Sequence, residues 1–159
     1  MQKRVENAID IFLDAISNNT LAKGTCAACA VGNLCAKVIG HTPTLNTDWQ
    51  PNNIWARLFM TSRKSQQDMR VFNTPEDIKE AEELISKTEF TEEELAKIEY
   101  AFETNTQIDY VLYGNYTPEE LREDQIKGLE AVVKVMLSFD GSKEKVKEVF
   151  TKRADLIPV

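Results

Sequence analysis

Apolar residues recur every three or four positions in several stretches of the chain, the spacing expected when one face of an α-helix is buried. The stripes are Val5, Ala8, Ile9, Phe12 and Ile16; Ile78, Ala81, Leu84 and Ile85; Leu95, Ile98, Ala101 and Phe102; Leu129, Val132, Val133 and Met136; and Val146, Val149 and Phe150. We therefore expect an amphipathic helix at each stripe, the longest over residues 117–138.

Capping residues mark where several of these helices begin. Thr91 is followed by Glu94, and Thr117 by Glu120, in the order of a capping box, in which each side chain binds the backbone N–H of the other residue. Pro118 adds a proline at the first helical position, where the missing N–H is not needed. Thr74, Pro75 and the acids after them predict a third start, and Ser142 a fourth.

Two segments lack a helical stripe. Residues 41–53 and 104–116 are long polar connections, and the second contains Tyr110, Tyr113 and Tyr116, which either pin the loop to the core or line a pocket. Nothing alternates with a period of two for long, although residues 108–113 fit a short strand or an irregular segment. The sequence predicts an all-α fold, a compact bundle of about six or seven helices in a single domain over residues 1–159.

Residues 24–41 hold the only histidine, His41, and all three cysteines: Cys26, Cys29 and Cys35. Thr25 is a good helix N-cap and Gly40 a good stop, so the Ala-rich stretch between them predicts one continuous helix.

On such a helix Cys26 and Cys35 point to opposite sides, and His41 lies about 22 Å along the axis from Cys26. A zinc site needs four converging ligands, and a cysteine nucleophile needs a base within reach. Only a break at Gly32 and Asn33 would gather the four side chains. We therefore expect buried structural cysteines, with no metal and no cofactor.

The charge of the chain is unevenly distributed. The net charge is −7, but residues 1–72 hold eight Lys/Arg and five Asp/Glu, whereas the remainder holds eleven and twenty-one. Phosphate contacts need clustered cations, so the acidic half excludes a nucleic-acid polymer as its partner. An anionic ligand would approach the N-terminal half.

Candidate binding residues for a small anionic ligand lie in that half. Lys23 and Thr25 flank Gly24 at an expected helix start, where free N–H groups receive phosphate or carboxylate. A second group mixes aromatic rings with cations, as nucleotide sites and protein interfaces do: Trp49, Trp55, Arg57, Arg63 and Lys64. A simple N-cap and core aromatics are the structural alternatives.

An acidic run provides the enzymatic alternative. Glu119, Glu120 and Glu123 match the Glu-Glu-x-x-Glu run with which all-α nucleotide pyrophosphohydrolases hold magnesium, but the later Glu-x-x-Asp of those enzymes is missing here. The catalytic set is incomplete, and we assign no catalytic residue.

Three stretches, residues 24–34, 102–106 and 124–133, resemble small proteins of unassigned function from Bacteroidetes bacteria and their phages. The resemblance spans most of the chain and implies a compact phage or accessory protein, but it carries over no site residue.

We expect a cytosolic protein, because the N-terminus is charged and no apolar run is long enough to cross a membrane. Because the catalytic set is incomplete, we expect a non-enzymatic binding protein. In its sharpest form this hypothesis is a phage anti-defence sponge that sequesters a nucleotide-type signal. The alternatives are a protein-interaction module that blocks a host protein, and the metal-dependent hydrolase. Whether the chain forms a homo-oligomer is left open.

Overall fold

The computed structural model describes residues 3–23, 29–38, 40 and 75–140. These form five α-helices and one 3-10 helix: α1 (Lys3–Ser17), α2 (Ala30–Val38), α4 (Pro75–Thr88), α5 (Glu92–Asn105), η2 (Tyr110–Asn115) and α6 (Pro118–Asp140). The all-α class is confirmed for this part of the chain, which contains no strand. The expected number of six or seven helices, and the helix after Ser142, are not tested, because residues 41–74 and 141–159 lie outside the described ranges.

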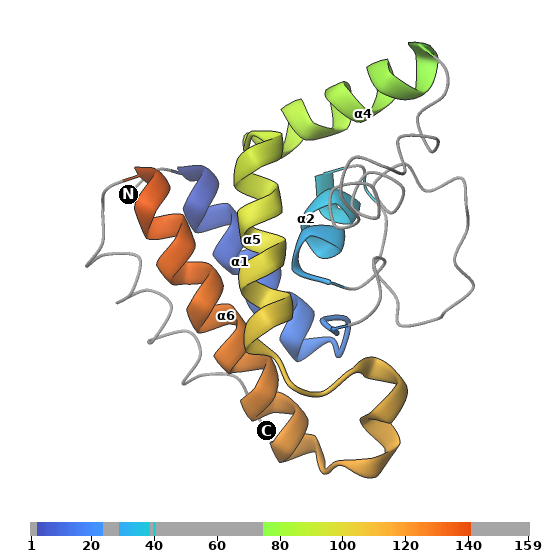
Figure 1. Cartoon of the computed structure of the whole chain (residues 1–159), viewed down its shortest axis with the longest axis vertical. Helices are drawn as coiled ribbons and strands as arrows, with labels where there is room; N and C mark the ends of the chain where they lie inside the picture. Colours follow the sequence, from blue (N-terminus) through green and yellow to red (C-terminus); the bar gives the residue numbers. More distant parts are fainter. Residues whose placement is uncertain (1–2, 24–28, 39, 41–74, 141–159) are drawn as a thin grey trace.

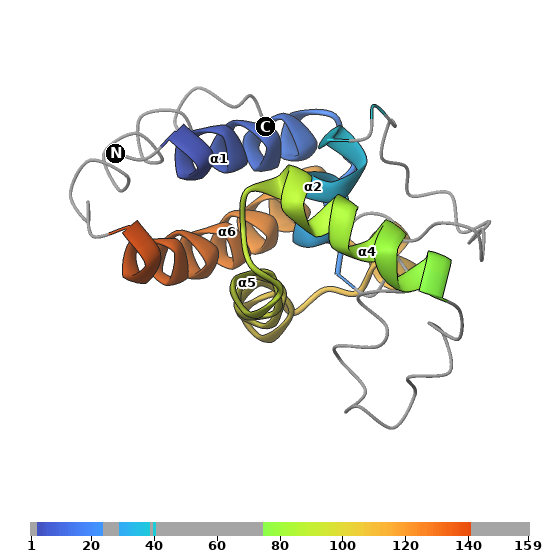
Figure 2. The same cartoon turned by 90° about the horizontal axis from the view of Figure 1, so that it is seen from above.

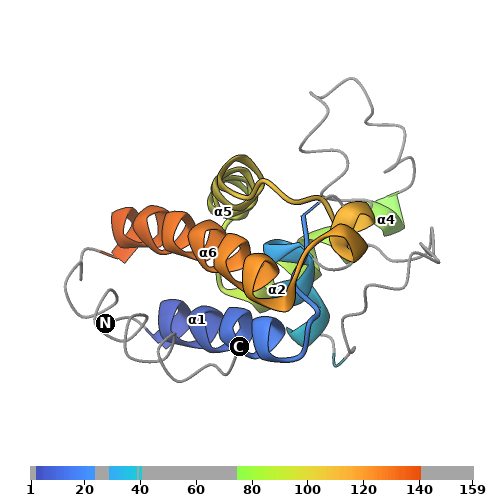
Figure 3. The same cartoon turned by 90° about the horizontal axis from the view of Figure 1, so that it is seen from below.

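Helices α1, α5 and α6 form the centre of the molecule (Figure 1). Seen from above and from below, α1 and α6 lie side by side and are viewed from the side, whereas α5 is viewed nearly along its axis (Figures 2 and 3). Helix α2 packs against α1, α5 and α4, and α4 leads away from the upper end of α5. The lower end of α5 leads into η2, which extends below the central helices before α6 begins.

The predicted apolar stripes face one another in the core. In α1, α5 and α6 the striped side chains are buried, and the largest with almost no exposure are Phe12, Phe102, Ile9, Ile16, Leu95, Ile98, Leu129 and Met136. Gly128 lets α5 and α6 approach closely, because a Cβ atom there would lie 2.5 Å from Thr106 Cγ2 and 2.8 Å from the Phe102 ring. The 3.6-residue period therefore predicted the core correctly in α1, α5 and α6.

Both predicted capping boxes are present. The Thr91 hydroxyl accepts from the N–H of Glu94, and the Glu94 carboxylate accepts from the N–H of Thr91, at 3.1 and 2.9 Å. Thr117 and Glu120 make the same reciprocal pair at the start of α6, at 3.2 and 3.0 Å. Helix α4 begins at Pro75, as expected.

The predicted continuous helix from Thr25 to Gly40 is wrong at Cys29, which is not helical, while residues 24–28 lie outside the described ranges. Helix α2 starts only at Ala30, and Cys29 is its cap: the Cys29 carbonyl accepts from Asn33, and its Sγ accepts from the N–H of Gly32 at 3.2 Å. The stop at Gly40 is confirmed by its positive φ of 77°.

A side chain from another helix stabilises the first turn of α2. Glu99 of α5 is 2% exposed, and its Oε2 accepts from the N–H of Val31 in the first turn of α2. A carboxylate at a helix N-terminus is favourable because it satisfies an otherwise unpaired donor and meets the positive end of the helix dipole. This tertiary contact has no local signature in the residues around Thr25.

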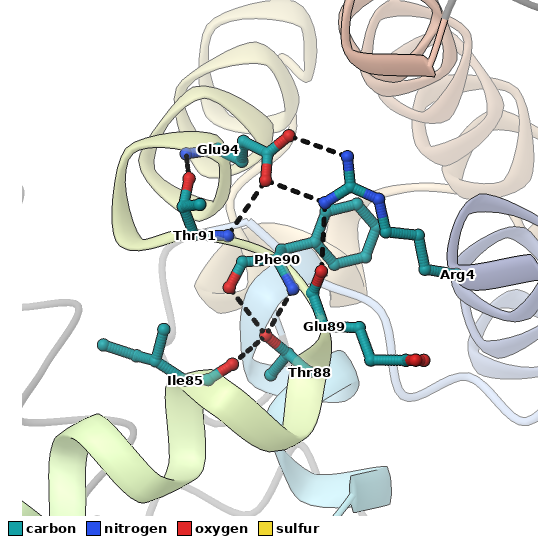
Figure 4. A network of polar contacts seen from close by, with 7 residues as sticks. All are labelled: Arg4, Ile85, Thr88, Glu89, Phe90, Thr91 and Glu94. Atoms are coloured by element: carbon teal, nitrogen blue, oxygen red, sulfur yellow. Dashed lines mark hydrogen bonds and ion pairs between the residues drawn. The ribbon is translucent and has the colours of Figure 1, made fainter. Parts of the chain in front are cut away.

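A polar contact joins α1 to the turn between the C-terminal end of α4 and the upper end of α5 (Figure 4). The Arg4 guanidinium donates two hydrogen bonds to the Glu94 carboxylate, at 2.8 and 3.0 Å, and one to the Glu89 carbonyl at 3.0 Å. It also lies 4.7 Å from the centre of the buried Phe90 ring. We call Arg4, Phe90, Thr91 and Glu94 the upper joint. The Arg4 guanidinium therefore pairs with the Glu94 carboxylate and also lies over the face of the Phe90 ring.

Candidate functional site

Of the seven predicted ligand-binding residues, the structure describes only Lys23. Its ammonium donates to the carbonyl oxygen of Thr106 at 2.7 Å, across 83 residues of sequence. The other six, Thr25, Trp49, Trp55, Arg57, Arg63 and Lys64, lie outside the described residues, as do the connection over residues 41–53 and the thiol of Cys26. The predicted anion site is therefore not tested, and it stays a prediction.

The two described cysteines are core residues. Cys29 and Cys35 are thiols that form no disulfide, and they have no exposed surface. Burial raises the pKa of Cys35 far above its usual range, and the nearby charge of Glu99 raises that pKa further. Cys35 is therefore a protonated, unreactive thiol at neutral pH. The described part of the chain contains no group of three His, Cys, Asp or Glu side chains placed to hold a metal ion.

The three glutamates of the acidic run lie on the exposed first turns of α6. Glu120 serves the capping box with Thr117, and Glu123 pairs with Lys127 one turn later at 3.5 Å. Glu119 is exposed in the first turn. This arrangement supplies negative charge at a helix N-terminus, where it stabilises the helix.

A second polar contact fixes the chain below α5. Asp124 of α6 is 8% exposed, and its two carboxylate oxygens accept from the backbone N–H groups of Gln107 and Ile108, at 2.8 and 3.0 Å. These two residues follow Thr106, the C-cap of α5, so Asp124 holds the chain where it leaves the helix. Hydrogen bonds that a buried carboxylate accepts from backbone N–H groups are among the stronger ones in proteins.

Tyr113 attaches the middle of η2 to the segment that follows α1. Its hydroxyl donates to the Leu21 carbonyl at 3.2 Å, and Gln125 Nε2 donates to the same carbonyl at 2.8 Å. Burial raises the pKa of Tyr113, and the negative charges of Asp124, Asp109 and Glu103 raise it further, against the opposing effect of the Gln125 hydrogen bond. Tyr113 therefore pins its loop, one of the two roles open to the loop tyrosines.

Asp109 is the N-cap of η2, and it makes both local and distant contacts. Its side chain accepts from the N–H of Val111 at 3.1 Å, its carbonyl accepts from Leu112 at 2.9 Å, and its backbone forms an isolated parallel bridge with Lys23. This bridge is the only strand-like pairing in the described residues. The segment near 108–113, where a short strand or an irregular segment was expected, contains the 3-10 helix η2.

We call Lys23, Thr106, Tyr113, Asp124 and Gln125 the lower cluster.

The outer side of the same segment is apolar and exposed. Val111 is 67% exposed, Leu112 44% and Tyr116 38%, and we call these three the 110–116 surface. Single exposed apolar residues are ordinary, but three within six positions of a hydrogen-bonded segment form a concentrated group. In the part of the chain that the structure describes, the remaining large exposed apolar side chain is Tyr100 of α5, at 71%.

Sequence reasoning did not single out Val111 or Leu112. The available signal was the run of four apolar residues from Tyr110 to Tyr113 inside a predicted polar loop. Such runs are unusual on a solvated surface and often mark a functional site there. Asp124 and Gln125 could not be recognised, because their partners are backbone atoms far away in the sequence.

Comparison of the chain with protein-family models, with curated proteins and with solved structures finds no match. The resemblance to small proteins of Bacteroidetes and their phages stays a prediction. Among the described helices, none combines the length and the apolar character required to cross a lipid bilayer.

Proposed function

We propose that the chain is a non-enzymatic protein-interaction module, and that the 110–116 surface is the part that contacts the partner. One observation carries the proposal: Val111 and Leu112 are exposed next to Tyr113, whose hydroxyl is bound to the Leu21 carbonyl. The chain that leads to them is held at Thr106 by Lys23 and at Ile108 by Asp124. A segment already fixed in the free protein loses little conformational entropy when it binds.

The position of Lys23 supports this choice over sequestration of a small anion. Its ammonium already donates to Thr106, so in the described structure it holds the lower cluster together. The cytosolic location belongs to the same proposal, and it is supported by Cys29 and Cys35, because thiols outside a disulfide are typical of a reducing compartment. Blocking a surface of a host protein is the action that such a module would perform.

The test is a comparative capture followed by a direct binding measurement. Wild type, the Val111→Asp/Leu112→Asp variant and the control Tyr100→Asp are each used as bait in an extract of the cells that encode the chain. Proteins retained by wild type and by the control, but lost with the double variant, are purified and titrated by calorimetry.

The control removes a similarly exposed apolar side chain from another element, so it measures non-specific binding through exposed apolar surface. We expect a partner whose affinity falls at least about a hundredfold in the double variant, the effect of removing two central contacts. A purified partner that binds wild type and the double variant equally would refute the assignment of the surface. Circular dichroism of each variant checks that the helices are intact.

A further inference from the structure

The charge around the 110–116 surface is one-sided. From Asp109 to Glu123 the sequence holds four carboxylates and one guanidinium. Glu119, Glu120 and Glu123 are exposed on the first turns of α6, which follow Tyr116 directly. The single cation, Arg122, is half-buried, and its Nη1 atom is enclosed with no hydrogen-bond partner in the structure as described. Lys127, one turn further along α6, pairs with Glu123 at 3.5 Å. Glu119 and Glu120 form no such ion pair within the described residues, so the exposed charge that follows Tyr116 in this part of the chain is mainly negative.

This charge decides which partners fit. A second copy of the chain would place the same carboxylates against each other, and a chain with a net charge of −7 repels itself as a whole. Nucleic acid and anionic lipid carry negative charge as well, and are repelled by the same groups. A partner with lysine or arginine beside its apolar contacts is attracted, and attraction of this kind increases the rate of association.

The size of the apolar surface restricts the partner further. Two side chains of one short 3-10 helix and that of its C-cap residue, Tyr116, provide a small contact, far below the area of a standard interface between two globular proteins. A contact of this size matches the stripe that one amphipathic helix presents at positions i, i+3, i+4 and i+7.

We infer that the 110–116 surface binds a basic amphipathic helix, with apolar residues of that helix on Val111, Leu112 and Tyr116 and its lysines or arginines on Glu119 and Glu123. The inference rests on the proposed function, because it names the chemistry of the partner that the same surface takes.

The test uses two synthetic probes and NMR. One is an 18-residue peptide of leucine and lysine in an amphipathic helical pattern, and the other has glutamate in place of every lysine. Each is titrated into ¹⁵N-labelled protein at low and high salt. We expect the Leu/Lys peptide to shift the amides of Val111, Leu112 and Tyr116, with an affinity that falls about fivefold or more between 50 and 300 mM salt. The Leu/Glu peptide should not bind.

Variants separate specific binding from adsorption to charge. Val111→Asp/Leu112→Asp adds two negative charges, so simple electrostatic adsorption of the Leu/Lys peptide would become stronger, whereas the inferred apolar contact is lost and binding falls at least about tenfold. Glu119→Lys/Glu123→Lys should also weaken binding by about tenfold. The matched control Glu82→Lys/Glu83→Lys makes the same charge change on α4, where both glutamates are exposed, and should change the affinity less than about twofold.

Binding that survives in the double aspartate variant, or that is equal for the two glutamate-reversal variants, would overturn the inference. So would shifts confined to other parts of the protein, or a dimer in the ultracentrifuge that Val111→Asp/Leu112→Asp dissociates.

The two proposals fail separately. If the cellular partner is lost with the double aspartate variant but binds independently of salt and of Glu119→Lys/Glu123→Lys, the proposed function stands and the basic helix is wrong. If the purified cellular partner binds the double aspartate variant as tightly as wild type, the proposed function fails.

Discussion

The upper joint and the lower cluster perform the same structural task at opposite ends of α5, but they treat apolar side chains differently. Each joins the chain around α1 to an end of α5 through a cation: Arg4 reaches Glu94 above, and Lys23 reaches Thr106 below. At the upper joint the guanidinium lies over Phe90, which is buried, while the lower cluster leaves Val111 and Leu112 in solvent. A polar junction in this fold can therefore cover its apolar neighbours, and the exposure at the lower end is the feature on which the proposed interaction surface rests.

The largest expected effect is at the lower cluster. Asp124→Ala leaves two backbone N–H groups without their carboxylate, and we expect it to cost about 3 kcal/mol of the free energy of unfolding. The corresponding change above, Glu94→Ala, should cost about 1 kcal/mol, because Glu94 and Arg4 are partly open to water. Urea denaturation of both variants measures the two values. Equal costs would mean that the two junctions do not differ in burial as described.

Gly128 tests how closely the lower end of α5 packs on α6. Gly128→Ala places a Cβ atom 2.5 Å from Thr106 Cγ2 and against the Phe102 ring, so one helix must shift. We expect a loss of about 2 kcal/mol from overpacking, although alanine is the better helix former. Thermal and urea unfolding measure the loss. A stabilised variant would show that the two helices are farther apart.

The upper joint should be sensitive to acid. The hydrogen bonds from Arg4 lower the pKa of Glu94 below the ordinary value of 4.5. The stability that this pair contributes is therefore complete above pH 4.5 and is lost as the pH falls through the lowered pKa. Arg4→Met, which keeps an apolar contact for Phe90, should cost about 1 kcal/mol at pH 7 and progressively less at lower pH. Urea midpoints between pH 7 and 3 measure this, and a constant difference would contradict it.

The smallest expected effect is at the edge of the lower cluster. Tyr113→Phe removes one hydroxyl, but the Leu21 carbonyl keeps its bond from Gln125, so the loss should be about 0.5 to 1 kcal/mol at pH 7. Because the pKa of Tyr113 is raised in the folded protein, its unfolded form releases the proton first, and wild type loses this part of its stability as the pH rises above 10. The difference in the free energy of unfolding between wild type and Tyr113→Phe should therefore become smaller above pH 10. A gap that widens above pH 10 would contradict the raised pKa.

Local sequence signals predicted most of the helices that the structure describes. The apolar stripes gave the buried faces of α1, α5 and α6, and Thr91 and Thr117 gave two helix starts with their partners. These signals succeed because stripe and cap depend on residues three or four positions apart.

Contacts between distant segments were not predictable in the same way. Helix α2 begins at Ala30, and in its first turn the N–H of Val31 donates to Glu99, a residue far along the chain. Lys23 looked like a free cation at a helix start, but its partner is a backbone carbonyl 83 positions away. The site was missed because exposure of Val111 and Leu112 depends on which way Asp124 and Tyr113 hold their segment.

The central claim is that the 110–116 surface is fixed in the free protein, and backbone ¹⁵N relaxation of Val111 and Leu112 tests it most directly. The account predicts order parameters of about 0.85 for both amides, equal to those of Leu95 and Ile98 in α5, and a marked decrease for Val111 and Leu112 alone in Asp124→Ala. Values below about 0.6 in wild type would contradict the account, because a segment that moves freely could not present a preformed surface to a partner.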